Sequence, residues 1–191
     1  MNIGLYFGSF NPIHVGHLII ANTMVEATDL EEVWFVVSPQ NPFKVRKSLL
    51  HEFDRLDMVR LAIGDNYHLR ASDIEFHLPK PSYTIDTLAH LYDKFPQHHF
   101  SLIMGEDNLE HFHKWKNAEQ ILKYHRLLVY PRPGVGEVGE LKEHPQVTYV
   151  EAPLMEISAT YIRNQVKEGR SLQYLVPDAV AERIRGSKFY L

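Results

Sequence analysis

The first 27 residues carry the pattern that most constrains the fold: a short apolar strand, a glycine-containing turn and a helix. Residues 2–7 (NIGLYF) are apolar and aromatic, which predicts a buried strand. From residue 18 onward, apolar side chains recur at helical spacing, which predicts a helix. The ten residues between them, 8–17 (GSFNPIHVGH), therefore lead from a strand into a helix N-terminus. Unpaired backbone N–H groups and the helix dipole make such a connection favourable for an anion.

Two histidines stand three residues apart in this connection. If the helix begins near Pro12, His14 and His17 share one of its faces, close to the positive end. Gly16 between them would cost up to about 1 kcal/mol inside a helix, and a close approach to its backbone is one reason to keep it. The pattern predicts a phosphate site with two imidazole donors. A turn that only caps the helix is the alternative.

Strand and helix patterns alternate along the rest of the chain. The sequence predicts buried strands at residues 32–37 and 100–104, and further strands near residues 69–76, 126–130 and 147–150. This alternation indicates an α/β fold: a doubly wound, mostly parallel, Rossmann-like sheet with helices on both faces. No repeat, low-complexity tract or long linker divides the chain, so residues 1–191 are expected to form a single domain.

The composition excludes several classes of protein. The chain has no cysteine, so it can form neither a disulfide framework nor a thiolate zinc site. Its formal net charge of −4 argues against a broad nucleic-acid surface, which needs a basic face. No apolar run approaches the roughly 18 residues that a membrane span needs, and no signal-peptide pattern opens the chain. We expect a cytoplasmic protein that contacts neither nucleic acid nor membrane.

Five polar or glycine-containing segments follow the predicted strands. In doubly wound sheets, ligands bind outside the carboxyl ends of the strands, where the strand order reverses. The five segments should therefore meet at that edge of the sheet; they are residues 8–17, 38–44, 105–107, 131–132 and 157–163. Anions must be held there by local groups, since the chain as a whole is acidic.

Two of these segments carry a family resemblance. The string Gly-Ser-Phe-Asn-Pro-Ile-His-x-Gly-His at residues 8–17 resembles the first signature of the His-x-Gly-His nucleotidyltransferases, and the bacterial nicotinate-nucleotide adenylyltransferases in particular. Residues 157–163 (ISATYIR) resemble the second signature of that superfamily. One departure is Phe7, where the family usually has a second glycine.

The resemblance implies a reaction. It is adenylyl transfer from ATP to nicotinate mononucleotide, which forms nicotinate adenine dinucleotide and pyrophosphate in NAD biosynthesis. A related adenylyltransferase that acts on nicotinamide mononucleotide or phosphopantetheine is the alternative. Mg²⁺ is expected as a cofactor bound through the ATP phosphates, with no protein metal ligand.

The resemblance also implies three groups of site residues. Those expected to act in the transfer are His14, His17, Lys44 and Arg163. Those expected to bind ATP are Gly8, Ser9, Phe10, His17, Gly105, Asp107, Ile157, Ser158, Thr160 and Arg163. Those expected to bind the mononucleotide are Asn11, Lys44, Ser82, Thr84, Trp115 and Arg132.

Several of these residues also have a purely structural interpretation. Ser82 or Thr84 could cap the helix that follows, and Asp107 could cap the next one. Trp115 could be a core aromatic residue. Ser158 could act only as a helix cap, with Arg163 as an exposed cation on that helix.

Overall fold

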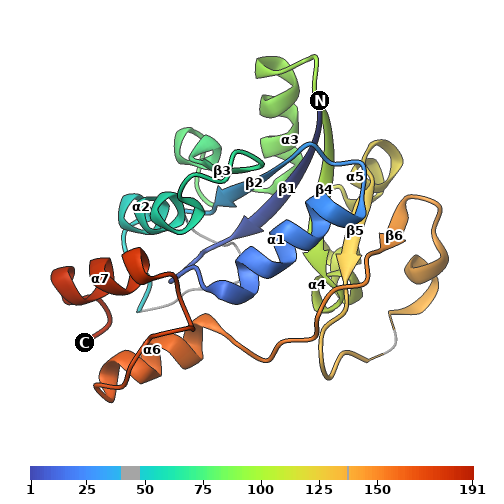
Figure 1. Ribbon diagram of the computed structural model, residues 1–191. Helices are drawn as coiled ribbons and strands as arrows, with labels where there is room; N and C mark the ends of the chain where they lie inside the picture. Colours follow the sequence, from blue (N-terminus) through green and yellow to red (C-terminus); the bar gives the residue numbers. More distant parts are fainter. Residues whose placement is uncertain (40–47, 137) are drawn as a thin grey trace.

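The computed structural model describes residues 1–39, 48–136 and 138–191 (Figure 1). In this part of the chain, six strands form one sheet in the order β3-β2-β1-β4-β5-β6, and every neighbouring pair is parallel. The strands are β1 Asn2–Gly8, β2 Glu32–Val37, β3 Leu69–Ser72, β4 His99–Gly105, β5 Leu127–Tyr130 and β6 Val147–Tyr149. The α/β prediction with a parallel sheet is confirmed.

Helices connect the strands and pack on both faces of the sheet. The α-helices are α1 Val15–Ala27, α2 Glu52–Ile63, α3 Thr84–Lys94, α4 Glu106–Glu110, α5 Ala118–Tyr124, α6 Ala159–Lys167 and α7 Asp178–Ser187. Short 3-10 helices are η1 Ile74–His77, η2 Phe112–Lys114 and η3 Gly139–Glu143. None of the described helices combines the length and the apolar character that crossing a membrane requires.

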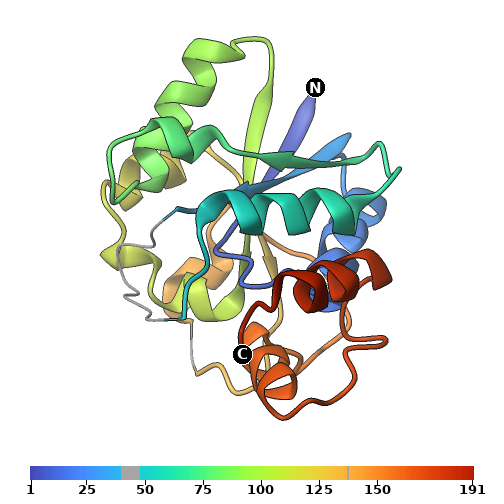
Figure 2. The same cartoon turned by 90° about the vertical axis from the view of Figure 1, so that its left-hand side faces the viewer.

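The alternation of side chains along β1 divides the core into two layers. Ile3 and Leu5 face one layer, where they pack with buried residues of α3, α4 and α5. Tyr6 faces the other layer, which α1, α2, α6 and α7 cover. On this side α7 packs against α2, and Arg183 of α7 forms ion pairs with Asp54 and Asp57 of α2 (Figure 2).

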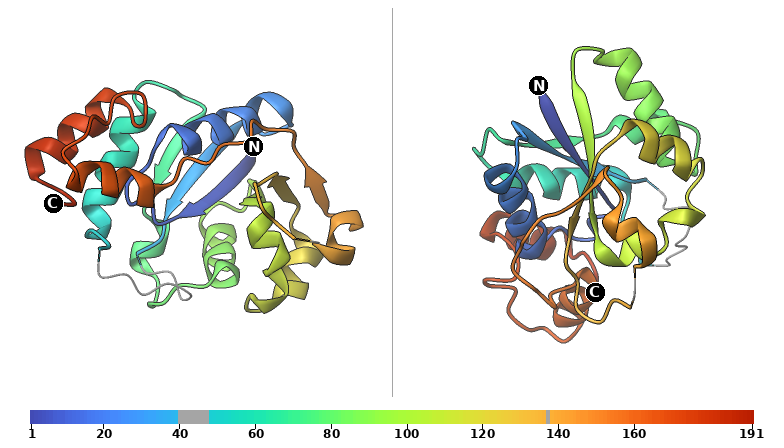
Figure 3. Two further views of the ribbon diagram at one scale, coloured as in Figure 1. Left: turned by 90° about the horizontal axis from the view of Figure 1, so that it is seen from below. Right: turned by 90° about the vertical axis from the view of Figure 1, so that its right-hand side faces the viewer.

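The strand order reverses between β1 and β4. From β1 the chain continues outward through β2 and β3, whereas β4, β5 and β6 extend from the other side of β1. The carboxyl ends of β1 and β4 therefore meet at the switch point, where open α/β sheets bind ligands. Figure 3 (left) views the molecule from below, with α1, α6 and α7 on one side of the sheet and α3 and α5 on the other.

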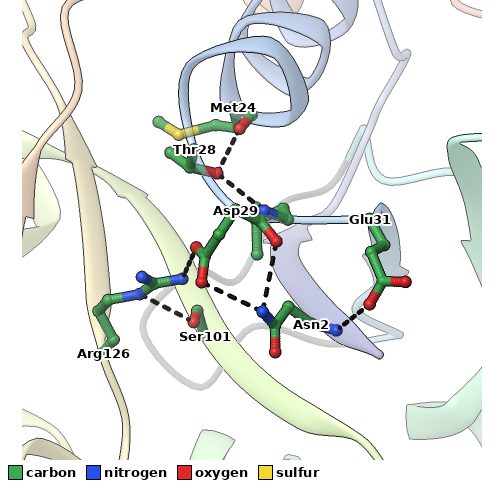
Figure 4. Close-up of polar contacts among 8 residues, drawn as sticks. Asn2, Met24, Thr28, Asp29, Glu31, Ser101 and Arg126 are labelled. Atoms are coloured by element: carbon green, nitrogen blue, oxygen red, sulfur yellow. Dashed lines mark hydrogen bonds and ion pairs between the residues drawn. The ribbon is translucent and has the colours of Figure 1, made fainter.

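Polar contacts hold the opposite, amino edge of the sheet together (Figure 4). Asp29, after α1, accepts hydrogen bonds from the Asn2 side chain (3.1 Å) and from Arg126 at the start of β5. Arg126 also donates to the hydroxyl of Ser101 in β4 (3.3 Å). These contacts tie β1, β4 and β5 to one loop and leave the carboxyl edge available for other groups.

Two predicted boundaries were wrong. Helix α1 begins at Val15 and not near Pro12, so His14 is its N-cap residue. The strand predicted for residues 69–76 ends at Ser72, because Asp73 turns the chain into η1 with its carbonyl accepting from the Phe76 N–H (2.8 Å). Apolar Ile74 and Phe76 resemble a strand in sequence, but here they lie on a 3-10 turn.

Candidate active site

A cavity of about 370 Å³ opens at the carboxyl edge of the sheet, within the size range of small-molecule sites. Most of the predicted site residues line it. These are Gly8, Ser9, Phe10, Asn11, His14, His17, Ser82, Thr84, Asp107, Trp115, Arg132, Ile157, Ser158 and Thr160. Gly105 and Arg163 lie behind the lining, and Lys44 is outside the described residues.

The two histidines lie at the start of α1 with their rings stacked. The ring centroids are 3.7 Å apart. The backbone N–H of His14 donates to Nδ1 of His17 (3.2 Å), so a neutral His17 ring carries its hydrogen on Nε2. The late start of α1 therefore keeps the two side chains together, as residues of the cap and the first turn.

Burial keeps both imidazoles neutral at physiological pH. It lowers the pKa of His14 to about 4, with a further contribution from nearby Arg132. Burial, His14 and Arg132 together lower the pKa of His17 well below its usual value. The aromatic ring of Phe10 packs edge-on against His17 at 5.1 Å between centroids. The site thus offers neutral N–H donors.

Gly16 explains how the two signature segments meet. A Cβ at this position would lie 2.7 Å from Cγ2 of Ile157 and 3.0 Å from Cε1 of His14. The absence of a side chain at Gly16 therefore lets Ile157, in the second signature segment, and the His14 ring come close to its backbone. Any larger residue would force the Ile157 side chain, the His14 ring or both to move.

The second signature segment is a helix start that also lines the cavity. Ser158 is the N-cap of α6, and its hydroxyl accepts from the Tyr161 N–H (3.1 Å). Arg163, 8% exposed, donates to the Thr160 hydroxyl (3.0 Å) and to the Asn11 carbonyl (2.8 Å). The cap interpretation of Ser158 is confirmed, and the alternative of an exposed Arg163 is wrong.

The turn before α3 forms another part of the wall. Tyr83 and not Ser82 or Thr84 occupies the N-cap position, and its side chain makes no capping bond. Ser82 instead donates to the carboxylate of buried Glu75 (2.9 Å). Trp115 lines the cavity while packing against Phe112 at 5.2 Å between ring centroids, so it serves both core and cavity.

Asp107 and Arg132 lie together at the exits of β4 and β5. Arg132 Nε is 3.7 Å from Asp107 Oδ1, and both side chains are partly exposed. A Cβ on Gly105 would collide with the Asp107 carboxylate and lie 3.0 Å from Cγ of Arg132. Glycine at this exit therefore lets the two side chains approach the strand end.

Comparison with known proteins gives the family. A cytidylyltransferase-like family model matches residues 5–165. A probable nicotinate-nucleotide adenylyltransferase of Cytophaga hutchinsonii is 65% identical over 190 residues, covering 100% of this chain and 98% of that protein. A second one, of Flavobacterium johnsoniae, is 55% identical over 191 residues, covering 100% and 99%. The chain belongs to the nicotinate-nucleotide adenylyltransferase family.

The fold comparison agrees with this assignment. Plasmodium falciparum nicotinic acid mononucleotide adenylyltransferase, complexed with NaAD, superposes with a TM-score of 0.83 and 19% identity. The alignment covers 99% of this chain and 97% of that one. At 19% identity, this match shows that the two proteins share a fold.

Asn11 is one of the residues predicted from the sequence to bind the mononucleotide. Asn11 borders the cavity but is 1% exposed. Its side chain donates to the Ser48 carbonyl (2.9 Å) and accepts from the Tyr190 hydroxyl (2.9 Å) and the Leu50 N–H (3.3 Å). Asn11 therefore joins the signature loop to residues 48–50 and to the C-terminal segment, and a substrate contact by Asn11 stays a prediction.

Other residues that surround the site were not predicted from the sequence. Phe7, which replaces the usual glycine, lines the cavity and packs against the core layer of α3 to α5. The hydroxyls of Tyr6 and Tyr130 lie 3.0 Å apart on the cavity wall. Arg55, 0% exposed, donates to the carbonyls of Ser9 and Ser38. The positions of Tyr6 and Tyr130 near the ends of strands could have indicated that they line the site. Arg55 could not have been found in this way, because a buried arginine that binds backbone carbonyls has no sequence pattern.

Proposed function

We propose that this chain transfers the adenylyl group of ATP to nicotinate mononucleotide and releases pyrophosphate, a step in the formation of NAD. The observation that carries the proposal is that the two signature segments meet at Gly16 and Ile157 and border one cavity. The relatives that are 65% and 55% identical over the whole chain, both named as probable nicotinate-nucleotide adenylyltransferases, support the same reaction.

In this reaction an oxygen of the mononucleotide 5′-phosphate attacks the α-phosphorus of ATP. The bond from that phosphorus to the bridging oxygen breaks, and pyrophosphate leaves with the electron pair. The nucleophile is already an anion, so no general base is needed. The protein must align the two substrates and offset charge as it moves toward the leaving group.

The neutral imidazoles suit this task. His17 carries its hydrogen on Nε2 and can donate to an oxygen of the transferred phosphoryl group. His14 lines the same cavity, stacked on His17. Both rings donate without adding a positive charge that would hold the released pyrophosphate.

At the other signature, we propose that the Ser158 and Thr160 hydroxyls and the first N–H groups of α6 hold the β- and γ-phosphates. Arg163 holds Thr160 in place through its hydroxyl and ties α6 to the first signature segment through the Asn11 carbonyl. Lys44, within residues 38–47, would contact a phosphate of the substrates. Asp107 would lie on the ATP side, while Ser82, Thr84, Trp115 and Arg132 would hold the mononucleotide.

We propose Mg²⁺ as the cofactor, carried by the ATP phosphates. Within residues 1–39, 48–136 and 138–191, no three His, Asp or Glu side chains come together as metal ligands. Asp107 offers a half-exposed carboxylate on the cavity, beside Arg132. This donor set fits an ion held mainly by phosphate and water oxygens. Bound there, Mg²⁺ would neutralise charge on the phosphates.

A substrate panel tests the proposal. Purified protein is mixed with Mg-ATP and either nicotinate mononucleotide, nicotinamide mononucleotide or phosphopantetheine, and both pyrophosphate and the adenylylated product are measured. We expect the highest kcat/KM with nicotinate mononucleotide. A higher value with either other acceptor would replace the proposal with the corresponding alternative, and absence of product with all three would refute adenylyl transfer.

A further inference from the structure

A buried carboxylate on the cavity wall touches neither of the reacting groups of the proposed adenylyl transfer. Glu75 lies in η1, is 2% exposed and lines the cavity. Among the described residues, no lysine, arginine or histidine forms an ion pair with it. A carboxylate in such a place is expensive unless donors satisfy its oxygens.

Hydroxyl groups from separate segments supply those donors. Ser82 donates to Oε2 (2.9 Å), and Thr87 of α3 donates to Oε1 (2.8 Å). Ser38, directly after β2, also hydrogen-bonds to the carboxylate. One buried group therefore joins the end of β2, the turn before α3 and the first turn of α3.

Stability alone does not account for this arrangement. Burial raises the pKa of Glu75, and the three hydroxyl groups offset only part of that effect. A raised pKa in the folded protein means that stability falls as pH rises from the unfolded value of 4.5 toward the folded one. Ionising this carboxyl group therefore costs stability in the folded protein, as functional groups often do.

The segment that Glu75 holds is the part of the wall assigned to the mononucleotide. Ser82, Tyr83 and Thr84 line the cavity together with Trp115 and Lys116. Lys116 Nζ lies 4.9 Å from the centre of the Tyr83 ring and 2.8 Å from Asp86 Oδ2, so the conformation of this turn also places a cation. Movement of the turn would change all of these surfaces together.

We propose that Glu75 is a positioning residue that holds the 82–84 turn in the conformation that receives the mononucleotide. It acts through the Ser82 and Thr87 hydroxyls, and it has no role in placing ATP. The inference rests on the proposed function, because it takes the mononucleotide as the acceptor bound at this turn.

The test compares Glu75→Leu with Glu75→Gln. Leucine keeps the size but removes the acceptor of the Ser82 hydroxyl, and it leaves the Thr87 hydroxyl only the Tyr83 carbonyl to donate to. Glutamine can still accept from Ser82 and can donate to Thr87, whose own hydrogen can pass to the Tyr83 carbonyl at 3.2 Å. We expect Glu75→Leu to raise KM for nicotinate mononucleotide at least 10-fold, with KM for ATP within 2-fold of wild type. Glu75→Gln should restore the first KM to within about 3-fold.

Two further measurements bear on the proposal, and the first of them, Ser82→Ala alone, keeps it falsifiable if Glu75→Leu folds poorly. Ser82→Ala should raise the same KM by itself, and Ser82→Ala with Glu75→Leu should be no worse than Glu75→Leu alone, because both remove one interaction. Glu32→Gln is the matched control, since Glu32 accepts from the Trp34 indole (2.7 Å) at the amino end of β2, and both KM values should stay unchanged.

The outcomes separate this inference from the proposed function. Mononucleotide binding is also followed by fluorescence, because Trp115 lines the cavity and is one of two tryptophans. Missing turnover in the wild-type protein would refute the proposed function, while the binding titrations would still compare the variants. Unchanged mononucleotide affinity in both Glu75→Leu and Ser82→Ala, or an equal rise in both substrate KM values, would overturn the role of Glu75.

Discussion

Replacing Gly16 with alanine tests the central contact of the site. The new Cβ would lie 2.7 Å from Cγ2 of Ile157 and 3.0 Å from the His14 ring, so at least one of them must move by several tenths of an ångström. Overpacking of this kind costs about 1–3 kcal/mol, and alanine returns up to about 1 kcal/mol of helix propensity. The net loss of stability is therefore about 0–3 kcal/mol, a fall in Tm of up to about 12 °C.

Activity should fall far more than stability. On the proposed function, the displaced groups would carry the phosphate contacts of both signature segments, and misplacement by about 1 Å can reduce a rate roughly 10²-fold. We therefore expect kcat of Gly16→Ala to drop by about that factor while the circular dichroism spectrum stays native. Gly186→Ala in α7 is the matched control, because a Cβ there meets nothing within 4 Å. That variant should keep its activity and gain up to about 1 kcal/mol of stability.

Relief of the contact gives the refuting result. Adding Ile157→Ala to Gly16→Ala removes the atom nearest the new Cβ, so part of the lost kcat should return. If Gly16→Ala turns over at the wild-type rate, the close approach has no bearing on catalysis. If the double variant is as impaired as the sum of both single changes, the two segments do not communicate through this contact.

Three other outcomes follow from the site. His17→Ala should lower kcat by at least roughly 10²-fold with Tm within a few degrees, the usual effect of losing a positioned donor; turnover within 3-fold of wild type would remove His17 from the chemistry. Arg55→Met leaves the carbonyls of Leu50, Ser9, Ser38 and Pro39 without their donor and should cost at least about 3 kcal/mol in urea unfolding; an unchanged urea midpoint would contradict this. His14 is a base whose pKa falls to about 4 on folding, so the free energy of unfolding should decrease as pH drops from 6.5 to 4. The decrease should be smaller in His14→Asn, and an equal decrease in both proteins would show that His14 is not buried in its neutral form.

Local patterns were sufficient to predict the sheet and the edge that carries the site. Most strands are short apolar runs, although β3 (LRAS) is not, and each connection leaves the carboxyl end of a strand. The convergence of residues 8–17, 105–107 and 157–163 therefore follows from a parallel sheet. The boundary of α1 was less predictable, because His14 is a residue that can serve as a cap or as a first-turn residue. Only the backbone geometry decides between them.

Contacts between distant parts of the chain could not be predicted from single residues. The Tyr190 hydroxyl reaches Asn11 across 179 residues, and Arg55 binds backbone carbonyls, which every residue has. Glu75 resembles any other charged residue of a turn until the three hydroxyl groups around it are seen together. The residues proposed to act on substrates carry a sequence signal, whereas those that hold them in place bond to the backbone or to common hydroxyls.

The electrostatics of the cavity explain why an acidic chain can use this edge for phosphates. The aromatic rings of Phe10 and Tyr6 bury His17, and burial removes its charge while leaving an N–H to donate. Of the two cations that line the described part of the cavity, Arg132 lies beside Asp107, and Lys116 is paired with Asp86. On the proposed function, the protein would meet anions mainly with oriented N–H and O–H dipoles at the starts of α1 and α6, while Mg²⁺ would come with ATP. The substrates of an adenylyl transfer carry the same total charge as its products. A site that binds phosphates through neutral dipoles can therefore bind substrates and products alike without trapping pyrophosphate.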